Sequence, residues 1–280
     1  MHVKILVDST ADLNPAVRER ISALPLTIHF GDEEYLDGVT ITGQEFYEKL
    51  VESDVMPTTS QASPYAFEEK FNELTTNGDQ VVAITVSSKL SGTYQSAMIA
   101  AENFLGKVWV VDSASVAIGA GILAEHALNL ADYGVSAAEI AEQLETVKSR
   151  IHVLAMLDTL EFLKRGGRIS KAVALAGTML SIKPVVSLDG GEITVRGKAR
   201  GSRQANNLLV KEIQAAGGVD FSMPLMLGYT GLSDVLLKKY IEDSGDLWQN
   251  NCQELPYAMI GSVVGTHAGP GAVAVAFFAP

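Results

Sequence analysis

Hydroxyl side chains gather in two short stretches of this sequence, and each stretch precedes a run that predicts a helix. The first is PTTSQASP at residues 57–64, and the second is SSKLSGTYQSA at residues 87–97. Hydroxyl groups, side-chain amides and the free N–H groups of a helix start are neutral donors that bind an anion. We therefore expect one anion-binding pocket whose donors are Thr59, Ser60, Ser91, Gly92 and Thr93.

The second stretch follows an apolar run that predicts a buried strand. Residues 81–86 (VVAITV) are almost all β-branched or small, as in strands that are covered on both faces. A turn follows, and a helix opens at Tyr94. A strand, a turn and a helix N-terminus in this order present free N–H groups to an anion. A simpler interpretation stays open, in which Ser91 only caps its helix.

Two further side chains have the chemistry of a functional site. His267 lies in the glycine-rich run VVGTHAGPG at residues 263–271, which we interpret as a turn, so that the imidazole either contacts a ligand or lies at the surface. Asp8 ends the first predicted strand, where ligands sit in open α/β sheets. As an enzyme residue it would be a phosphatase nucleophile, but the second aspartate of such metal-dependent sites is missing because position 10 is threonine.

The overall charge argues against nucleic acid as a partner. The 280 residues carry a net charge of −12 at pH 7, and nucleic acid is bound chiefly through Lys and Arg. Nine of the 21 basic residues nevertheless fall between Lys164 and Arg203, against two acidic residues, Asp189 and Glu192. This basic segment is either a solvated surface or a docking patch for an acidic partner or a phosphate.

Several classes of protein are excluded by what the sequence lacks. The one cysteine, Cys252, allows neither an internal disulfide nor a multi-cysteine metal site. Walker, dinucleotide-binding, GxSxG and His-Glu-x-x-His motifs are absent, so we expect no metal and no cofactor. Near-apolar runs such as residues 172–182 are shorter than the roughly 20 residues that span a bilayer. Because residues 1–4 lead directly into a strand pattern, we expect a cytoplasmic protein without stable membrane insertion.

Alternating strand-like and helix-like runs indicate an α/β protein of two domains. We place an N-terminal α/β domain with a mainly parallel sheet at residues 1–149 and a C-terminal α/β domain with a mixed sheet at residues 150–280. The predicted strands are 3–10, 26–30, 35–38 (the return of a hairpin whose turn is 31–34), 81–86, 108–113, 153–157, 183–188, 192–196, 225–230, 257–260 and 272–278. The predicted helices are 15–21, 42–51, 64–74, 94–100, 115–133, 136–149, 160–164, 202–215 and 234–243.

Local signatures fix three of the predicted helix starts. Threonine or serine followed three residues later by glutamate forms a capping box, and a serine before proline is typical of an N-cap with proline in the first turn. The signatures are Thr42 with Glu45, Ser136 with Glu139, and Ser63 with Pro64. The segment before the last of these is expected to be a loop, with Thr59, Ser60 and Gln61 facing a cleft.

Seven segments, in order along nearly the whole chain, carry a family pattern. They are KILVDSTADL (4–13), DGVTIT (37–42), TSQ (59–61), SSKLSGTYQSA (87–97), KRGGRIS (164–170), KPVVSLDGGEI (183–193) and His267 with the GPG turn (269–271). Together they resemble the DegV family of bacterial fatty-acid-binding proteins. The resemblance implies two α/β domains, a long-chain fatty acid buried between and within them, and a non-enzymatic carrier that presents this acid to a separate fatty acid kinase, which forms the acyl phosphate.

The resemblance also implies residue roles. Carried over by position, Thr59 and Ser91 hold the carboxylate with His267 beside them, and Arg168 and Arg200 meet the kinase. Two places depart from the family pattern: position 62 is alanine where proline is usual, and residues 201–204 (GSRQ) contain fewer lysines than expected. The second departure weakens the docking hypothesis.

The carrier hypothesis agrees with the magnitudes involved. Burial is worth about 0.8 kcal/mol per methylene, so a C16 tail contributes on the order of 10 kcal/mol before association costs. The buried carboxylate needs compensation, which we expect from Thr59, Ser91, the N–H groups beside them and a protonated His267. Two alternatives stay open: a phosphotransfer or hydrolytic enzyme that acts on a polyol or phosphate ester through Asp8 or His267, and a ligand-free scaffold that binds through its basic segment.

Overall fold

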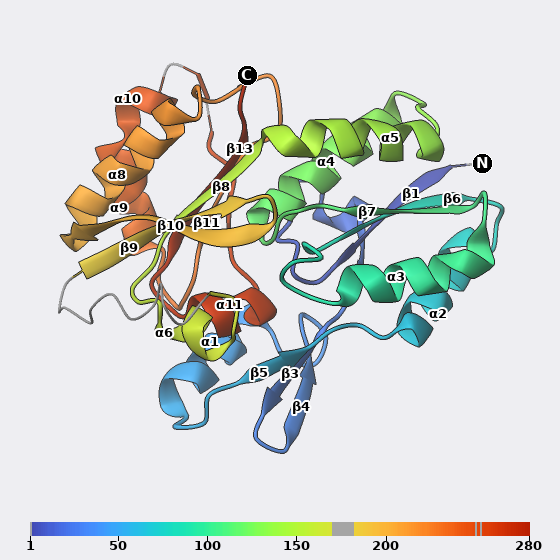
Figure 1. Cartoon of the computed structure of the whole chain (residues 1–280), viewed down its shortest axis with the longest axis horizontal. Helices are drawn as coiled ribbons and strands as arrows, with labels where there is room; N and C mark the ends of the chain where they lie inside the picture. Colours follow the sequence, from blue (N-terminus) through green and yellow to red (C-terminus); the bar gives the residue numbers. More distant parts are fainter. Residues whose placement is uncertain (1, 170–181, 250, 253) are drawn as a thin grey trace.

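The chain folds around two large sheets that lie side by side, with a small third sheet below them (Figure 1). The structure is a computed structural model, and it describes residues 2–169, 182–249, 251–252 and 254–280. The predicted α/β class, with a parallel sheet in the N-terminal half and a mixed sheet in the C-terminal half, is confirmed.

The N-terminal sheet has four parallel strands in the order β2 (Ser22–Leu24), β1 (Val3–Asp8), β6 (Gln80–Thr85) and β7 (Val108–Asp112). Side chains alternate between its faces, so Leu6 packs toward one layer of helices while Ile5 and Val7 pack toward the other. The first layer is α2 (Pro64–Thr75) and α3 (Thr93–Ala101), and the second is α4 (Ile118–Asp132) and α5 (Ala137–Val147).

The C-terminal sheet has six strands and mixed pairing. Its order is β10 (Glu192–Arg200), β9 (Ile182–Asp189), β8 (Ile151–Met156), β13 (Val273–Phe278), β11 (Met226–Tyr229) and β12 (Tyr257–Met259), with β11 and β12 parallel and the other pairs antiparallel. One face is covered by α8 (Gly201–Ala215), α9 (Val235–Asp243) and α10 (Gly245–Trp248). The other face meets α4, α6 (Glu161–Arg165) and α11 (Ser262–Ala268).

The small antiparallel sheet, in the order β4 (Glu33–Leu36), β3 (Thr27–Phe30) and β5 (Thr58–Ser60), lies with α1 (Gly43–Glu52) under α11. The prediction of a loop over residues 57–64 was therefore partly wrong, because three of these residues pair with β3. All three predicted helix starts are confirmed: Thr42 and Ser136 form capping boxes, and Ser63 accepts a hydrogen bond from the backbone of Ala66.

Two other predicted elements differ from the structure. The helix expected at residues 15–21 is only a turn of 3-10 helix, η1 (Arg18–Arg20), followed by the edge strand β2. The run around His267 is not a turn but the helix α11, whose end is marked by Gly269 at a φ of 71°. Short 3-10 turns also follow α3 and α5, at η2 (Glu102–Phe104) and η3 (Lys148–Arg150).

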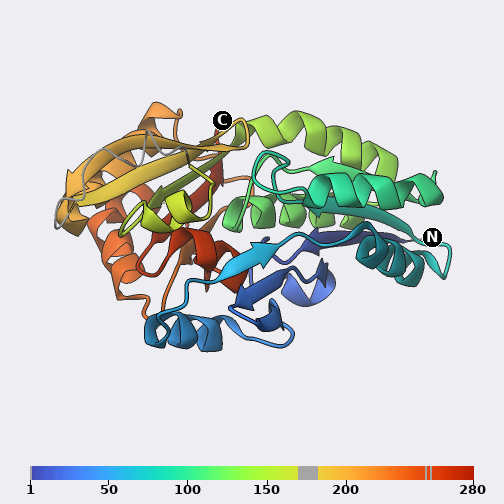
Figure 2. The same cartoon turned by 60° about the horizontal axis from the view of Figure 1, so that its bottom comes forward.

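Two helices connect the halves of the molecule. α4 packs on β1 of the parallel sheet and on β8, β11 and β13 of the mixed sheet. α11 belongs to the last part of the chain but contacts α1, β3 and β5 of the first part. Figure 2 shows α11, in red, beside β5, in light blue. The division of the chain into domains at residues 149 and 150 stays a prediction.

Candidate functional site

A cavity of about 410 Å³ lies where the two halves meet. One part of its wall is polar and comes from residues 59–61, 91–92, Arg168 and His267. The rest is mainly aliphatic. The first half supplies Leu26, Val86, Leu90, Val116 and Ala117, and the mixed sheet, α6, α11 and the loops beside them supply Val153, Ala155, Leu157, Leu163, Val186, Leu188, Ile193, Ile260, Val263, Val264, Ala268, Ala272 and Ala274. Thr10 and Ser187 are the further polar residues of the lining. A site with one polar end and a long apolar body suits an amphiphile.

The pattern of the central strands explains why space remains here. On β13, Val273, Val275 and Phe277 point to the helices α8 and α9, whereas Ala274 and Ala276 point to the opposite face. Ala274 pairs with Ala155 of β8, and both line the cavity. Because both side chains are single methyl groups, they leave unfilled space in an otherwise closely packed layer.

The strand β5 aims Thr59 at the cavity. Thr59 is paired with Ile28, a core residue, and residues directly opposite in a sheet point to the same face. Its hydroxyl oxygen Oγ1 lies 2.9 Å from Nε2 of His267 on α11. These two residues are 208 positions apart in the chain, so the tertiary fold creates the pair that the resemblance implied.

His267 is neutral rather than protonated. Burial, with a smaller contribution from the Arg168 guanidinium, lowers the pKa of His267 from 6.5 to about 4. Without a ligand the imidazole is therefore not the imidazolium that we expected beside an anion, and its charge beside a bound carboxylate stays a prediction. Within the described part of the chain, Nδ1 of His267 is buried without a hydrogen-bond partner. A proton on Nε2, donated to Thr59, avoids an unpaired buried N–H and frees the threonine hydroxyl to donate to an anion.

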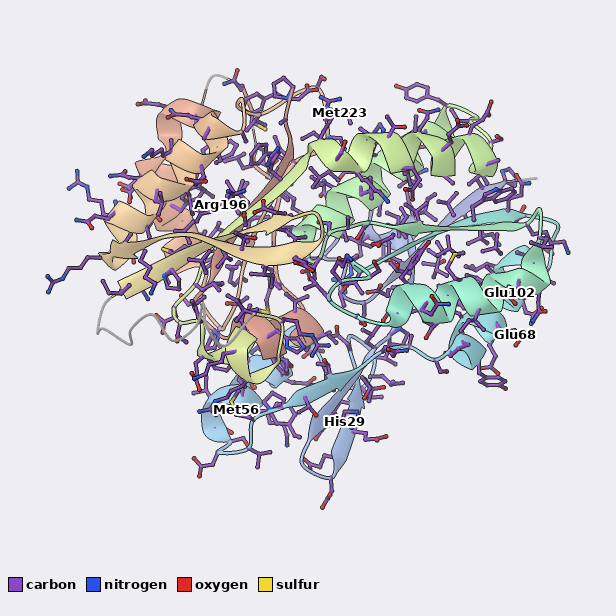
Figure 3. The ribbon with its side chains drawn as sticks, viewed as in Figure 1. His29, Met56, Glu68, Glu102, Arg196 and Met223 are labelled. Atoms are coloured by element: carbon purple, nitrogen blue, oxygen red, sulfur yellow. The ribbon has the colours of Figure 1, made fainter. Side chains whose placement is uncertain are left out.

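The hydroxyl group of Ser60 points away from the cavity. Successive residues of a strand face opposite sides, and Oγ of Ser60 lies 2.8 Å from Nε2 of His29, which Figure 3 labels on the small sheet. Ser60 borders the cavity, but its hydroxyl is on the outer face. Its expected role as a carboxylate donor is therefore not supported by its orientation.

The turn before α3 brings Ser91 and Gly92 to the cavity wall, whereas Thr93 lies behind them. The hydroxyls of Ser91 and Thr93 are 2.9 Å apart, and Ser91 accepts a bond of 3.3 Å from the Thr93 amide. Thr93 is fully buried and acts on Ser91 rather than on the cavity. The N–H of Gly92 donates to none of the described residues, so it is available to a ligand.

Arg168, predicted as a docking residue, also lines the cavity. Its Nε donates to the Leu90 carbonyl at 3.1 Å and its Nη1 to the Gly166 carbonyl at 2.7 Å, which holds the guanidinium across the turn before α3. Gly166 itself lies against His267, since a Cβ there would be 2.1 Å from Nδ1. The sequence analysis did not predict that Arg168 points into the cavity. The glycine pair of KRGGRIS was a signal for it, since glycine allows a close approach of the backbone to another group. Arg200 is exposed at the end of β10.

Asp8 has a structural environment. It is buried, its Oδ1 accepts bonds from the amide and hydroxyl of Thr10, and its Oδ2 accepts a bond of 2.7 Å from the Val86 amide. Oδ1 thus fixes the turn after β1, and Oδ2 joins the carboxyl end of β1 to that of β6. Such a carboxylate is poorly placed for attack on a substrate, which weakens the enzyme alternative that rests on it.

The basic segment is largely paired within the protein. Lys164 and Arg165 contact Glu161, and Lys183 contacts Asp158. Arg196, labelled in Figure 3 on β10, contacts Asp189 at 2.6 Å. Lys171 lies outside the described residues. These contacts leave less free positive charge than the sequence suggested.

Comparison with known proteins assigns the whole chain to one family. A family model described as "Uncharacterised protein, DegV family" matches residues 2–280. The chain belongs to the DegV family. A DegV domain-containing protein of Caldanaerobacter subterraneus subsp. tengcongensis is 34% identical to it, with 98% of each chain covered. A DegV domain-containing protein of Deinococcus radiodurans is also 34% identical, with 99% of this chain and 98% of that protein covered.

Solved structures of DegV proteins share this fold over their full length. A DegV family protein of Thermus thermophilus, described by its fatty acid binding, superimposes with a TM-score of 0.89 at 32% identity, with 100% of both chains covered. DegV of Bacillus subtilis, described as a fatty acid binding protein, gives a TM-score of 0.84 at 29% identity, again with 100% of both chains covered. Within the part of this DegV chain that the structure describes, no helix is both long and apolar enough to span a bilayer.

Proposed function

We propose that this protein binds a long-chain fatty acid, with the carboxylate at Thr59, Ser91 and His267 and the acyl chain in the aliphatic part of the cavity. The observation that carries the proposal is the cavity itself, which has hydroxyl donors from the first half of the chain and the His267 imidazole from the second half at one end, and mainly aliphatic side chains along the rest. The fatty acid binding described for the Thermus thermophilus and Bacillus subtilis relatives supports it.

The head-group end is built to accept a carboxylate without a full ion pair. The Thr59 and Ser91 hydroxyls and the Gly92 amide are neutral donors, and hydrogen bonds to a charged acceptor are about twice as strong as those to a neutral one. Arg168 adds positive charge at the same end, although its guanidinium is already hydrogen-bonded to two carbonyls. A carboxylate held in this way remains open to chemistry by a second protein.

We further propose that the bound acid is presented to a partner fatty acid kinase, and that Arg168 and Arg200 take part in the docking. This protein would then be a cytoplasmic carrier, with the kinase activity in the partner. The exposed position of Arg200 fits a contact residue, whereas Arg168 would act from the cavity rim.

Direct identification of the ligand tests the binding proposal. Lipid extracted from purified protein should contain fatty acids by mass spectrometry, and delipidated protein should bind a fluorescent fatty acid that palmitate displaces. Protein that is empty and binds no fatty acid after delipidation contradicts the proposal.

The docking proposal needs a separate experiment with a fatty acid kinase. Arg200→Glu should slow phosphorylation of the bound acid without weakening its binding, because Arg200 is exposed and does not line the cavity. Lys211→Glu, a charge reversal at an exposed position of the following helix α8 but outside the basic segment, serves as the control. Unchanged phosphorylation by the Arg200 variant contradicts the docking role.

A further inference from the structure

The helix α11 is too short to be stable without contacts to the rest of the protein. It has seven residues, Ser262–Ala268, and isolated helices of that length are unstable in water. Yet it supplies His267 to the polar end of the cavity and Val263, Val264 and Ala268 to the wall. Its position must therefore come from contacts with the rest of the molecule.

Two buried carboxylates meet the start of this helix. The Gly261 amide donates to Oδ1 of Asp12 at 2.8 Å, and the Ser262 amide donates to Oδ1 of Asp37 at 3.2 Å. Asp12 lies in the loop after β1 and Asp37 directly after β4, so both belong to the first part of the chain. The first amides of a helix have no partners within it, and a negative charge there is favourable.

Burying these two carboxylates costs free energy, which their hydrogen bonds to the start of α11 have to offset. Both are buried, and a Cβ placed on Gly261 would lie 3.3 Å from Asp12 Oδ1 and 3.6 Å from Asp37 Oδ2, so they flank one residue. Burial raises the pKa of each carboxyl, well above the usual range for Asp12, and the proximity of Asp37 raises that of Asp12 further. In the described part of the chain, Oδ2 of Asp12 has no hydrogen-bond partner.

A third contact fixes the same end of α11 from below. The Tyr47 hydroxyl, on α1, donates to the Ile260 carbonyl at 2.9 Å. Gly265 then packs so closely that a Cβ would lie 2.5 Å from the Tyr47 hydroxyl oxygen. The helix start is thus held by side chains of three segments from the first part of the chain, and its other end carries the imidazole that reaches Thr59.

We infer that Asp12 and Asp37 are positioning residues that hold α11 where His267 reaches Thr59, and that they thereby set the affinity for a ligand's carboxylate without touching it. The inference rests on the proposed fatty acid site. Neither residue lines the cavity, so their effect has to pass through the helix.

The test compares an acid and an alcohol of equal chain length. Asp37→Ala and Asp12→Ala should each weaken palmitate binding by tenfold or more while changing hexadecanol binding less than threefold, because hydrogen bonds to a charged carboxylate depend more strongly on the place of the Thr59 and His267 pair than those to a neutral alcohol. Asn in either position keeps an acceptor oxygen and should restore most of the palmitate affinity. The matched control is Asp79→Ala, an equally buried carboxylate that bonds the His2 amide and Lys4.

A second variant removes the donor instead of the acceptor. Ser262 is the first residue of α11 and follows a residue with a ψ of 172°, so its backbone position accepts proline, which deletes the amide that bonds Asp37 together with the buried hydroxyl. Ser262→Ala removes the hydroxyl but keeps the amide and is the matched control. Ser262→Pro should also lower palmitate affinity selectively, by fivefold or more. The inference is overturned if the alanine variants that fold and Ser262→Pro leave the palmitate-to-hexadecanol ratio within twofold of wild type, or lose both ligands equally.

One further measurement separates this inference from the proposed function. If the wild-type protein binds neither ligand, the fatty acid proposal fails, and the positioning role is then read in the ligand-free protein. The ¹⁵N signals of the His267 imidazole should lose the signature of a hydrogen-bonded Nε2 in Asp37→Ala and Ser262→Pro but not in Asp79→Ala. Unchanged imidazole signals in both variants overturn the inference.

Discussion

Replacing Thr59 by valine exchanges its hydroxyl for a methyl group and leaves the size of the side chain almost unchanged. Valine keeps the branched shape and suits β5, but the donor that faces the cavity and the partner of His267 Nε2 at 2.9 Å are both lost. A hydrogen bond to a charged group is worth about 1.5–3 kcal/mol, which corresponds to a loss of palmitate affinity of about 10- to 150-fold. A neutral alcohol head group should lose only about 2- to 12-fold, from the roughly 0.5–1.5 kcal/mol of an uncharged bond.

The two consequences of the change appear in different experiments. The lost partner of His267 is missing with and without ligand, so it should lower the free energy of unfolding, by about 1–3 kcal/mol for an unsatisfied buried group, rather than the affinity. The lost donor to the carboxylate should appear in displacement of a fluorescent fatty acid from delipidated protein by palmitate and by hexadecanol. Thr58→Val is the matched control, because Thr58 is exposed on the same strand.

Two results would refute this reasoning. If Thr59→Val weakened palmitate and hexadecanol by the same factor, the hydroxyl would not be a carboxylate donor. If Thr58→Val lowered palmitate affinity as much as Thr59→Val, the strand rather than the inward side chain would be responsible.

Three further predictions concern the same region. Burial lowers the pKa of His267 from 6.5 to about 4, so as the pH falls the unfolded chain is protonated at this residue before the folded chain is, and the free energy of unfolding should decrease between these two pH values. Urea unfolding of wild type and of His267→Gln at several pH values isolates the effect, and a difference in free energy of unfolding that does not change with pH contradicts it. Gly265→Ala should destabilise the fold by about 1–3 kcal/mol through overpacking against Tyr47, and unchanged denaturant midpoints would exclude that close contact. Ala155→Leu adds carbon atoms beside Ala274 in the cavity wall, so the variant should prefer shorter fatty acids than wild type does. Displacement of a fluorescent fatty acid by acids of increasing chain length measures this preference, and an unchanged order of affinities argues against this wall as the acyl site.

Local chemistry in the sequence was enough to predict most of the secondary structure. The run 81–86 became β6, displaced by one residue, and the Thr42 and Ser136 capping boxes formed as predicted. Each of these depends on neighbours within a few positions, namely burial on both faces of a strand and side-chain bonds to nearby amides. At residues 15–21 a single turn of 3-10 helix forms in place of the predicted helix, and the next residues, Ser22–Leu24, pair with β1 as an edge strand. A single sequence carries no local sign of that pairing.

The choice of site residues was partly within reach of the sequence. Thr59, Ser91 and His267 were selected from hydroxyl-rich stretches and a family pattern, and the structure brings all three to one cavity. The orientation of Ser60 depends on strand pairing, because a segment expected to be a loop gives no alternation of faces. The inward position of Arg168 depends on carbonyl acceptors, one of them 78 positions away.

The amino-acid sequence by itself determined the α/β class, the hydroxyl chemistry of the two stretches and the small residues of the central strands, since these follow from side-chain type and short spacing. Only the tertiary structure decided the charge of His267, the role of Asp8 and the meeting of Thr59 with an imidazole 208 positions away. The physical reason is that burial and long-range packing set protonation and contact, and both are properties of the folded chain as a whole.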